Sequence, residues 1–423
     1  MKKFLATILV VSIIVSFIAC KNKNDVKGDD GSVVNSNIQQ NNGSSQESNI
    51  QQNSSTTGNS NAQLAIGAQI KYNEGKSDPR SFANTYKCLT EQKKLDIVYI
   101  GGSVTNGRGS SFGSSWRELT TKWFRENYKT ATINETNAAI GGTSSMWGLA
   151  RLEKDVLSKN PDLVFIEFAV NDSYAGFTEM QSAVFMDAMI RRINEYNSKT
   201  DIVIVFVTDN SKREKEYINV KGHRTVAEYY GIPCVDAGKA LINEMNSSGK
   251  AWEYYFTDSV HPGDEGYKVY AAEVRKTLEA LLQKATTASA VEHKLSDKAA
   301  TTSVLKKLIA VEVEKVKYDS NWLYREKAKV SIGNKSELGA RKQGATVTYE
   351  FEGSVVGCIY NAKKNGNIKV SIDGGNEKTF SLSGDTSGCI ERVFYDNLNS
   401  GKHTLKIEYI GTGYFALGAL LVG

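Results

Sequence analysis

The chain has 423 residues, which is long enough for more than one domain. Hydrophobic residues make up 40% of it and charged residues 23%, a composition that excludes a wholly disordered chain. The formal charge of +5 includes Lys2 and Lys3, which lie in a segment that we expect to be removed, and no basic block follows them. We therefore expect no nucleic-acid partner. The four histidines and five cysteines lack the paired spacing of a zinc site, so we expect no metal and no cofactor.

The N-terminal residues 1–19 have the pattern of a bacterial signal peptide. Two lysines precede an uninterrupted run of apolar and small residues. The run ends in Phe17-Ile18-Ala19-Cys20, which resembles a lipobox with Phe in the usual place of Leu. The resemblance implies cleavage before Cys20 and diacylglycerol on its sulfur, which would anchor the protein in a lipid bilayer. The alternative is an ordinary signal peptide followed by a chance cysteine.

Residues 20–62 are rich in Asn, Gln, Ser and Gly and contain no aromatic side chain. Such a segment cannot bury enough apolar surface to offset the entropy lost on ordering. We expect a lipidated, disordered tether, and hence an extracytoplasmic protein that is lipid-anchored to a bacterial cell membrane.

Residues 63–285 alternate short apolar runs with amphipathic segments. We expect strands over 95–100, 131–137, 162–168, 202–207 and 232–235. We expect helices over 114–128, 147–159, 178–198, 214–230 and 265–284. Apolar strands separated by helices indicate a parallel sheet that is covered on both faces. The prediction is a doubly wound three-layer α/β/α sandwich, flavodoxin-like in class.

The C-terminal part has a different period. Residues 286–303 interrupt the pattern and are predicted to be a linker, and residues 304–423 alternate with a period of two. Asp373-Gly374-Gly375-Asn376 separates two such runs, which is typical of a hairpin. We predict an antiparallel β-sandwich and a candidate carbohydrate-binding domain. Cys358 and Cys389 could pair there after export, but the sequence does not decide this.

Polar residues and glycines follow several of the predicted strands. Ser103 follows Gly101-Gly102, Gly142 follows the second strand, and Asn171 follows the third. Asp258 and His261 stand three residues apart in a later loop. Because ligands bind at the carboxyl ends of parallel strands, we expect these groups to meet at one edge of the sheet. Each feature alone is weak, since Gly142 could be a turn residue and Asn171 a helix cap.

In order, these blocks resemble those of the SGNH hydrolases, or GDSL-type esterases and lipases, over about residues 93–285. Gly101-Gly102-Ser103 resembles the family's G-D-S block with Gly102 in place of Asp, and Ala169-Val170-Asn171-Asp172 resembles G-x-N-D with Ala169 in place of Gly. The segment 137–152 is similar to the second block, and Asp258 with His261 to the D-x-x-H block. The loss of Asp at position 102 removes a side chain that normally braces the nucleophile loop.

The resemblance implies a role for each residue. Ser103 is the expected nucleophile, His261 its general base and then acid, and Asp258 the group that orients the imidazole. The amides of Ser103 and Gly142 and the side chain of Asn171 are the expected oxyanion donors.

We therefore expect a carboxylic ester hydrolase that works through an acyl-enzyme. Its expected substrate is an acylated carbohydrate, with acetyl as the expected acyl group, or another small ester. We expect the segment up to about residue 290 to hydrolyse small esters by itself. The alternatives are a lysophospholipase or short-chain lipase, and a non-catalytic glycan-binding surface lipoprotein. The remaining histidines are expected at the surface: His223, His293 and His403.

Overall fold

The computed structural model describes residues 67–213, 215–326, 336–363, 365–382 and 390–423. The predicted signal peptide, the tether, its Cys20 and the second cysteine of the possible disulfide, Cys389, lie outside these residues. The described residues all belong to one compact unit. Among the residues that the structure describes, no helix combines the length and the apolar character that crossing a membrane requires.

The first sheet is parallel and has five strands in the order β2-β1-β3-β4-β5. Its strands are β1 (Lys94–Gly101), β2 (Thr132–Asn137), β3 (Leu163–Glu167), β4 (Asp201–Val205) and β5 (Cys234–Val235). Every residue of β3 and β4 is buried, as expected for a sheet covered on both sides. The order is the flavodoxin-like one, which confirms the predicted fold class.

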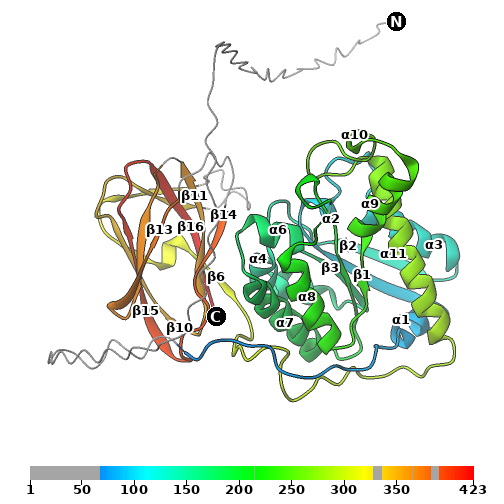
Figure 1. Ribbon diagram of the computed structural model, residues 1–423. Coiled ribbons are helices and arrows are strands. Elements are labelled where there is room, and N and C mark those ends of the chain that lie inside the picture. The colour runs from blue at the N-terminus through cyan, green and yellow to red at the C-terminus, as the bar shows by residue number, and fades with distance from the viewer. Residues whose placement is uncertain (1–66, 214, 327–335, 364, 383–389) are drawn as a thin grey trace, which may run out of the picture. The chain divides into compact units, whose positions relative to one another are not determined.

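Helices cover both faces of this sheet, as Figure 1 shows. One face carries α1 (Ala83–Lys87), α3 (Trp116–Asn127), α9 (Ala237–Ser248) and α11 (Asp264–Ala285). The other carries α4 (Ser145–Ala150), α6 (Ala169–Tyr174), α7 (Glu179–Tyr196) and α8 (Ile218–Tyr229). Short helices fill the connections: η1 (Cys88–Gln92), α2 (Ser103–Asn106), α5 (Leu152–Asp155), η2 (Leu157–Lys159), η3 (Asn210–Lys212) and α10 (Trp252–Tyr255).

Three sequence predictions about helices need correction. The single helix expected over 147–159 is three pieces, α4, α5 and η2; the backbone leaves the helical region at Arg151, and the last piece, η2, is a short 3₁₀ turn. Arg151 turns inward at this break, where its guanidinium donates to the carbonyl of Ala138. The helix α9 was not predicted, and α8 begins four residues later than expected.

The C-terminal domain consists of two antiparallel sheets. The first has the order β13-β12-β15-β10-β7 and the second the order β14-β11-β16-β9-β8, with β6 paired to β16. The first sheet contains β7 (Lys317–Tyr318), β10 (Thr346–Glu352), β12 (Ile368–Ile372), β13 (Gly375–Phe380) and β15 (Lys402–Tyr409). The second contains β6 (Ile309–Glu312), β8 (Trp322–Arg325), β9 (Glu337–Ala340), β11 (Val356–Lys363), β14 (Ile390–Tyr395) and β16 (Tyr414–Val422). A one-turn helix, η4 (Val313–Lys315), follows β6. These two antiparallel sheets confirm the predicted antiparallel β fold of residues 304–423.

The second sheet is buried on both faces, which the sequence analysis did not anticipate. Cys358 and Leu420 point into the core of the sandwich, whereas their neighbours Ile359 and Leu421 belong to the core of the α/β domain. Val393 of β14 also faces the α/β core. A period of two thus sends alternate side chains of one sheet into two different cores. Side chains of the β domain therefore complete the core of the α/β domain, and whether residues up to about 290 hydrolyse small esters by themselves stays a prediction.

The predicted linker, residues 286–303, runs along the α/β domain and is held by polar contacts. Asn84 donates to the carbonyl of Val291, and Thr301 donates to buried Asp187. Within the same segment His293 lies 2.7 Å from Asp201.

The three histidines expected at the surface are instead buried, at 0%, 6% and 7% exposure for His223, His293 and His403. Each imidazole has a carboxylate partner within 3.0 Å, namely Asp172, Asp201 and Asp373. A buried polar side chain is tolerated when it is hydrogen-bonded, which explains the difference.

Candidate active site

Ser103 lies where the central strand β1 ends. It is the first residue of the short helix α2, and Gly102 precedes it as the N-cap. A Cβ atom at Gly102 would lie 2.1 Å from Oδ1 of Asn171, so no side chain fits there while Asn171 keeps its place. The absence of a side chain at Gly102 therefore leaves the room that the Asn171 side chain occupies.

His261 and Asp258 lie in the loop between α10 and α11. The loop is fixed by a backbone hydrogen bond from Thr257 to His261, by a bridge between Phe256 and Pro262, and by the Trp252 indole, which donates to the carbonyl of Asp258. These bonds hold the D-x-x-H block in a tight loop outside any helix.

The structure brings Ser103, His261 and Asp258 together in series. Ser103 Oγ is 2.8 Å from Nε2 of His261, and Nδ1 of the same ring is 2.7 Å from Oδ2 of Asp258. The other oxygen of Asp258 accepts the amides of Val260 and His261 at 2.8 and 2.7 Å. This geometry leaves Nε2 of the imidazole free to take the hydroxyl proton of the serine.

Asp258 is kept in its charged form by its partners. Partial burial works against the charge, but hydrogen bonds from the amide and ring of His261 and from the amide of Val260 outweigh it and lower the pKa of Asp258. A carboxylate that stays ionised can hold one tautomer of the imidazole and stabilise the imidazolium.

Ser103 and His261 line a cavity of about 290 Å³. Gly142 and Asn171, the other two expected oxyanion donors, line the same cavity. Gly142 has a φ of +77°, a conformation that side chains rarely adopt, and a Cβ at the preceding Gly141 would lie 3.4 Å from Cβ of Ser103. Oδ1 is the atom of Asn171 that lies nearest to Gly102, and Nδ2 is the group of this side chain that can donate a hydrogen bond. The remaining lining residues are Val104, Arg108, Val170, Tyr174, Ala175, Val260, Ile390 and Glu391.

A buried glutamate, which the sequence analysis missed, braces the nucleophile loop. Glu167 ends β3 and is 1% exposed, and its carboxylate accepts the hydroxyl of Thr105 at 2.8 Å. The backbone amides of Gly102 and Thr105 also favour the charged form of this carboxylate, whose second oxygen has no hydrogen-bond partner among the described residues. Burial nevertheless raises the pKa of Glu167 to about 7. Glu167 thus supplies from the neighbouring strand the support that an Asp at position 102 would give.

The loop that contains Gly141 and Gly142, here called the glycine loop, leads into α4. Two carboxylates hold the start of this helix by hydrogen bonds. Asp172 accepts the amide and the hydroxyl of Ser145 at 2.7 and 2.8 Å. Glu391 of the β domain accepts the amide of Ser144 at 2.9 Å. Glu391 stands two residues before Val393 in β14, so both side chains lie on the face of the strand that packs on the α/β domain. An acidic residue at an apolar position of a strand is the only sequence feature that could have pointed to this role.

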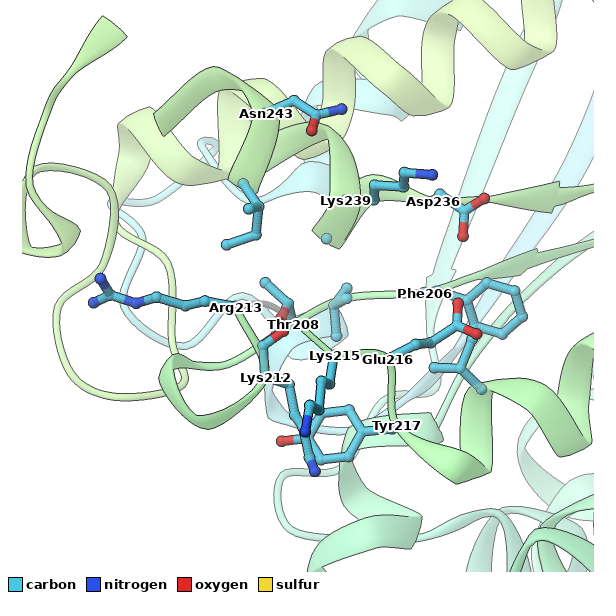
Figure 2. A pocket seen from close by; sticks show the side chains of 14 residues that line it. Phe206, Thr208, Lys212, Arg213, Lys215, Glu216, Tyr217, Asp236, Lys239 and Asn243 are labelled. Atoms are coloured by element: carbon cyan, nitrogen blue, oxygen red, sulfur yellow. Dashed lines mark hydrogen bonds between the residues drawn. The ribbon is translucent and has the colours of Figure 1, made fainter. Parts of the chain in front are cut away.

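A larger pocket of about 460 Å³ lies beside the carboxyl ends of β4 and β5 (Figure 2). Its charged lining includes Lys212, which lies over the ring of Tyr217, and Glu216 and Asp236, which both accept from Arg224. Its lining contains no serine, cysteine or histidine, so it offers no pair of nucleophile and imidazole base. In the described ranges no group of three or more His, Cys, Asp and Glu side chains is arranged to hold a metal ion. The smaller cavity is the candidate active site.

A doubly wound sheet with a serine, an imidazole and a carboxylate in series at its edge defines the class of the α/β serine hydrolases. Residues 99–269 match the model of the GDSL-like Lipase/Acylhydrolase family, which agrees with the resemblance of the sequence blocks to the SGNH hydrolases. By class the chain is a carboxylic ester hydrolase.

Relatives in sequence agree with this class, and a solved structure shares the fold. An arylesterase of Vibrio mimicus is 27% identical over 125 residues, which are 29% of this chain and 62% of the arylesterase. The protein named thioesterase 1/protease 1/lysophospholipase L1 of Escherichia coli (strain K12) is 22% identical over 187 residues, 44% of this chain and 84% of the relative. A two-domain esterase active on acetylated mannans has the same fold, with a TM-score of 0.66 and 22% identity over 84% of this chain and 98% of that chain.

Proposed function

We propose that this protein is a membrane-tethered, extracytoplasmic serine esterase that removes acetyl groups from polysaccharide through an acyl-enzyme. The observation that carries the proposal is the hydrogen-bonded series Ser103–His261–Asp258 beside Gly142 and Asn171 in one cavity.

In the proposed reaction, Ser103 Oγ attacks the ester carbonyl while Nε2 of His261 takes its proton. The carbonyl oxygen becomes an oxyanion, which the amides of Ser103 and Gly142 and the Asn171 side chain stabilise. The tetrahedral intermediate expels the sugar hydroxyl, which receives the proton from His261, and leaves an acetyl ester on Ser103. Water then attacks this ester while His261 takes its proton; the bond between the acetyl carbon and Ser103 Oγ breaks, His261 returns the proton to Oγ, and acetate leaves.

The size and lining of the cavity support a small acyl group. Its apolar lining includes the short side chains of Val104, Val170 and Ala175 beside the larger Ile390 and Tyr174, and its volume of about 290 Å³ is small for a ligand pocket. The two-domain esterase whose fold extends over most of this chain acts on acetylated mannans, which supports a polysaccharide substrate.

A substrate screen tests the proposal. The protein is offered acetylated mannan and xylan, p-nitrophenyl acetate, butyrate, octanoate and palmitate, and a lysophospholipid. We expect acetate release from at least one glycan and a rate that falls steadily as the acyl chain lengthens. A preference for palmitate or for the lysophospholipid would contradict deacetylation and favour the lysophospholipase alternative. Binding to glycan with no ester hydrolysis would favour the non-catalytic alternative.

The tether is proposed from the residues around Cys20 and has its own test. Labelled palmitate should enter the wild-type protein when it is produced in a bacterium with a lipoprotein pathway, because two or three acyl chains form the anchor. Cys20→Ala should take up no label and should leave the membrane fraction. Cys88→Ala, a change at a buried cysteine, is the matched control and should be labelled normally. Equal labelling of Cys20→Ala and wild type would refute lipidation at this position.

A further inference from the structure

Glu391 of the β domain is a buried carboxylate with an unusual set of partners. It lies in β14, is 3% exposed, and contacts two residues that stand 247 and 244 positions earlier in the chain. One oxygen accepts the amide of Ser144 at 2.9 Å. The other accepts the hydroxyl of Ser144 and, at 3.1 Å, the amide of Trp147. All three donors belong to the beginning of α4.

These contacts replace the usual cap of a helix. A serine at an N-cap ordinarily accepts the amide of the third helical residue with its own oxygen. Ser144 is the N-cap of α4 but makes no such bond, since its hydroxyl donates to Glu391. Glu391 instead accepts the amide of Trp147, the third residue of the helix. The β domain therefore supplies the cap that ends the glycine loop.

The capped turn directly follows Gly142. On its upstream side the loop is closed by Thr143, whose hydroxyl donates to the carbonyl of Ile140. On its downstream side Asp172 holds Ser145, and Glu391 holds Ser144. A Cβ built at Gly142 meets no atom within 4 Å, so packing against a neighbour does not fix this residue itself. Its orientation depends on the hydrogen bonds on either side.

The β domain also packs closely against α4 and the α/β core beside this turn. The backbone of β11 approaches α4 so closely that a Cβ at Gly357 would lie 2.6 Å from the end of the Met146 side chain. Val393, on the same strand as Glu391, packs in the α/β core. Ile390 and Glu391 both line the cavity that holds Ser103 and His261.

We propose that Glu391 is a positioning residue for ester hydrolysis: from the β domain, its carboxylate holds the turn after Gly142 so that the Gly142 amide points at the developing oxyanion. The inference rests on the proposed esterase function. It makes the oxyanion hole of the α/β domain dependent on the docked β domain. An error of about 1 Å in the position of such a group can cost about 10²-fold in rate.

The test compares Glu391→Gln and Glu391→Ala with the wild type in the full chain. We expect kcat for p-nitrophenyl acetate to fall about 10²-fold in Glu391→Ala, which loses all three bonds, and less in Glu391→Gln, which keeps one acceptor. KM should change little. The Ki of an alkyl boronate, which forms a tetrahedral adduct on the serine, should rise in parallel with the loss of kcat.

Glu337→Gln is the matched control. Glu337 is another buried glutamate of the β domain, but it pairs with Arg325 and Tyr414 of the same domain. Its replacement should leave kcat and the boronate Ki unchanged. Thermal unfolding shows whether each variant is folded, and Glu391→Gln, nearly isosteric with the original, decides the case if Glu391→Ala does not fold.

Two outcomes would overturn the inference. One is a folded Glu391→Gln with the kcat and boronate Ki of the wild type. The other is a change confined to KM, which would make Glu391 a contact for the substrate and not a support for the loop. Failure of the esterase function itself would be recognised separately, since wild type and Ser103→Ala would then show the same rate.

Discussion

Ser103→Ala should lower kcat/KM for p-nitrophenyl acetate by about 10⁴- to 10⁶-fold. The hydroxyl that attacks the ester is lost, while His261, the cavity and the oxyanion donors stay in place. Some catalysis over water should therefore remain, because the donors and the binding site still act on a carbonyl attacked by water. The measurement is the initial rate of nitrophenol release by purified protein at several substrate concentrations.

Ser158→Ala is the matched control for this change, since Ser158 is an exposed serine of η2 that lies in no cavity described above. A fluorophosphonate should add covalently to wild type and to the control, but not to Ser103→Ala. Equal rates in wild type and Ser103→Ala would mean that the hydrogen-bonded series is not a catalytic site.

Asn171→Ala should lower kcat by about 10²- to 10³-fold, which corresponds to about 2.7–4 kcal/mol of transition-state stabilisation. The effect on KM should be small, because Nδ2 is proposed to donate to an oxygen that becomes charged only in the transition state. The variant should also bind the boronate more weakly. Full kcat and KM curves with p-nitrophenyl acetate separate the two parameters.

Asn171→Ala should not disturb the fold around Gly102. Without the asparagine side chain, the space beside Gly102 opens, so Asn171→Ala should fold as well as the wild type. Asn134→Ala, at an exposed residue of β2, serves as the control for a lost carboxamide. If kcat of Asn171→Ala equals that of the control, Asn171 has no part in the reaction.

The elements that position the triad could be predicted because they depend on local patterns. The apolar run at 95–100 indicates a buried strand, and the turn after it places Ser103 at the edge of the sheet. Pro262 favours a loop conformation at His261, which agrees with the bridge found there. For these residues the spacing along the chain and the geometry of parallel sheets are enough.

The supports of the site could not be predicted in the same way. Glu167 and Glu391 are acidic residues in apolar strands, and only the fold shows that their carboxylates face backbone amides. Nor does a lone histidine reveal its carboxylate partner: His223 is buried because Asp172, 51 residues away in sequence, lies beside it. Such pairs are fixed by long-range packing, which composition and periodicity do not encode.

The sheet that faces two cores has a consequence for unfolding. Removing the β domain would expose the apolar face that receives Ile359, Val393 and Leu421, and it would leave the start of α4 without its cap. Neither half can then melt without destabilising the other. Heat or denaturant should therefore unfold the α/β domain and the β domain together in a single cooperative transition. Two domains that do not share a core would instead unfold in separate transitions.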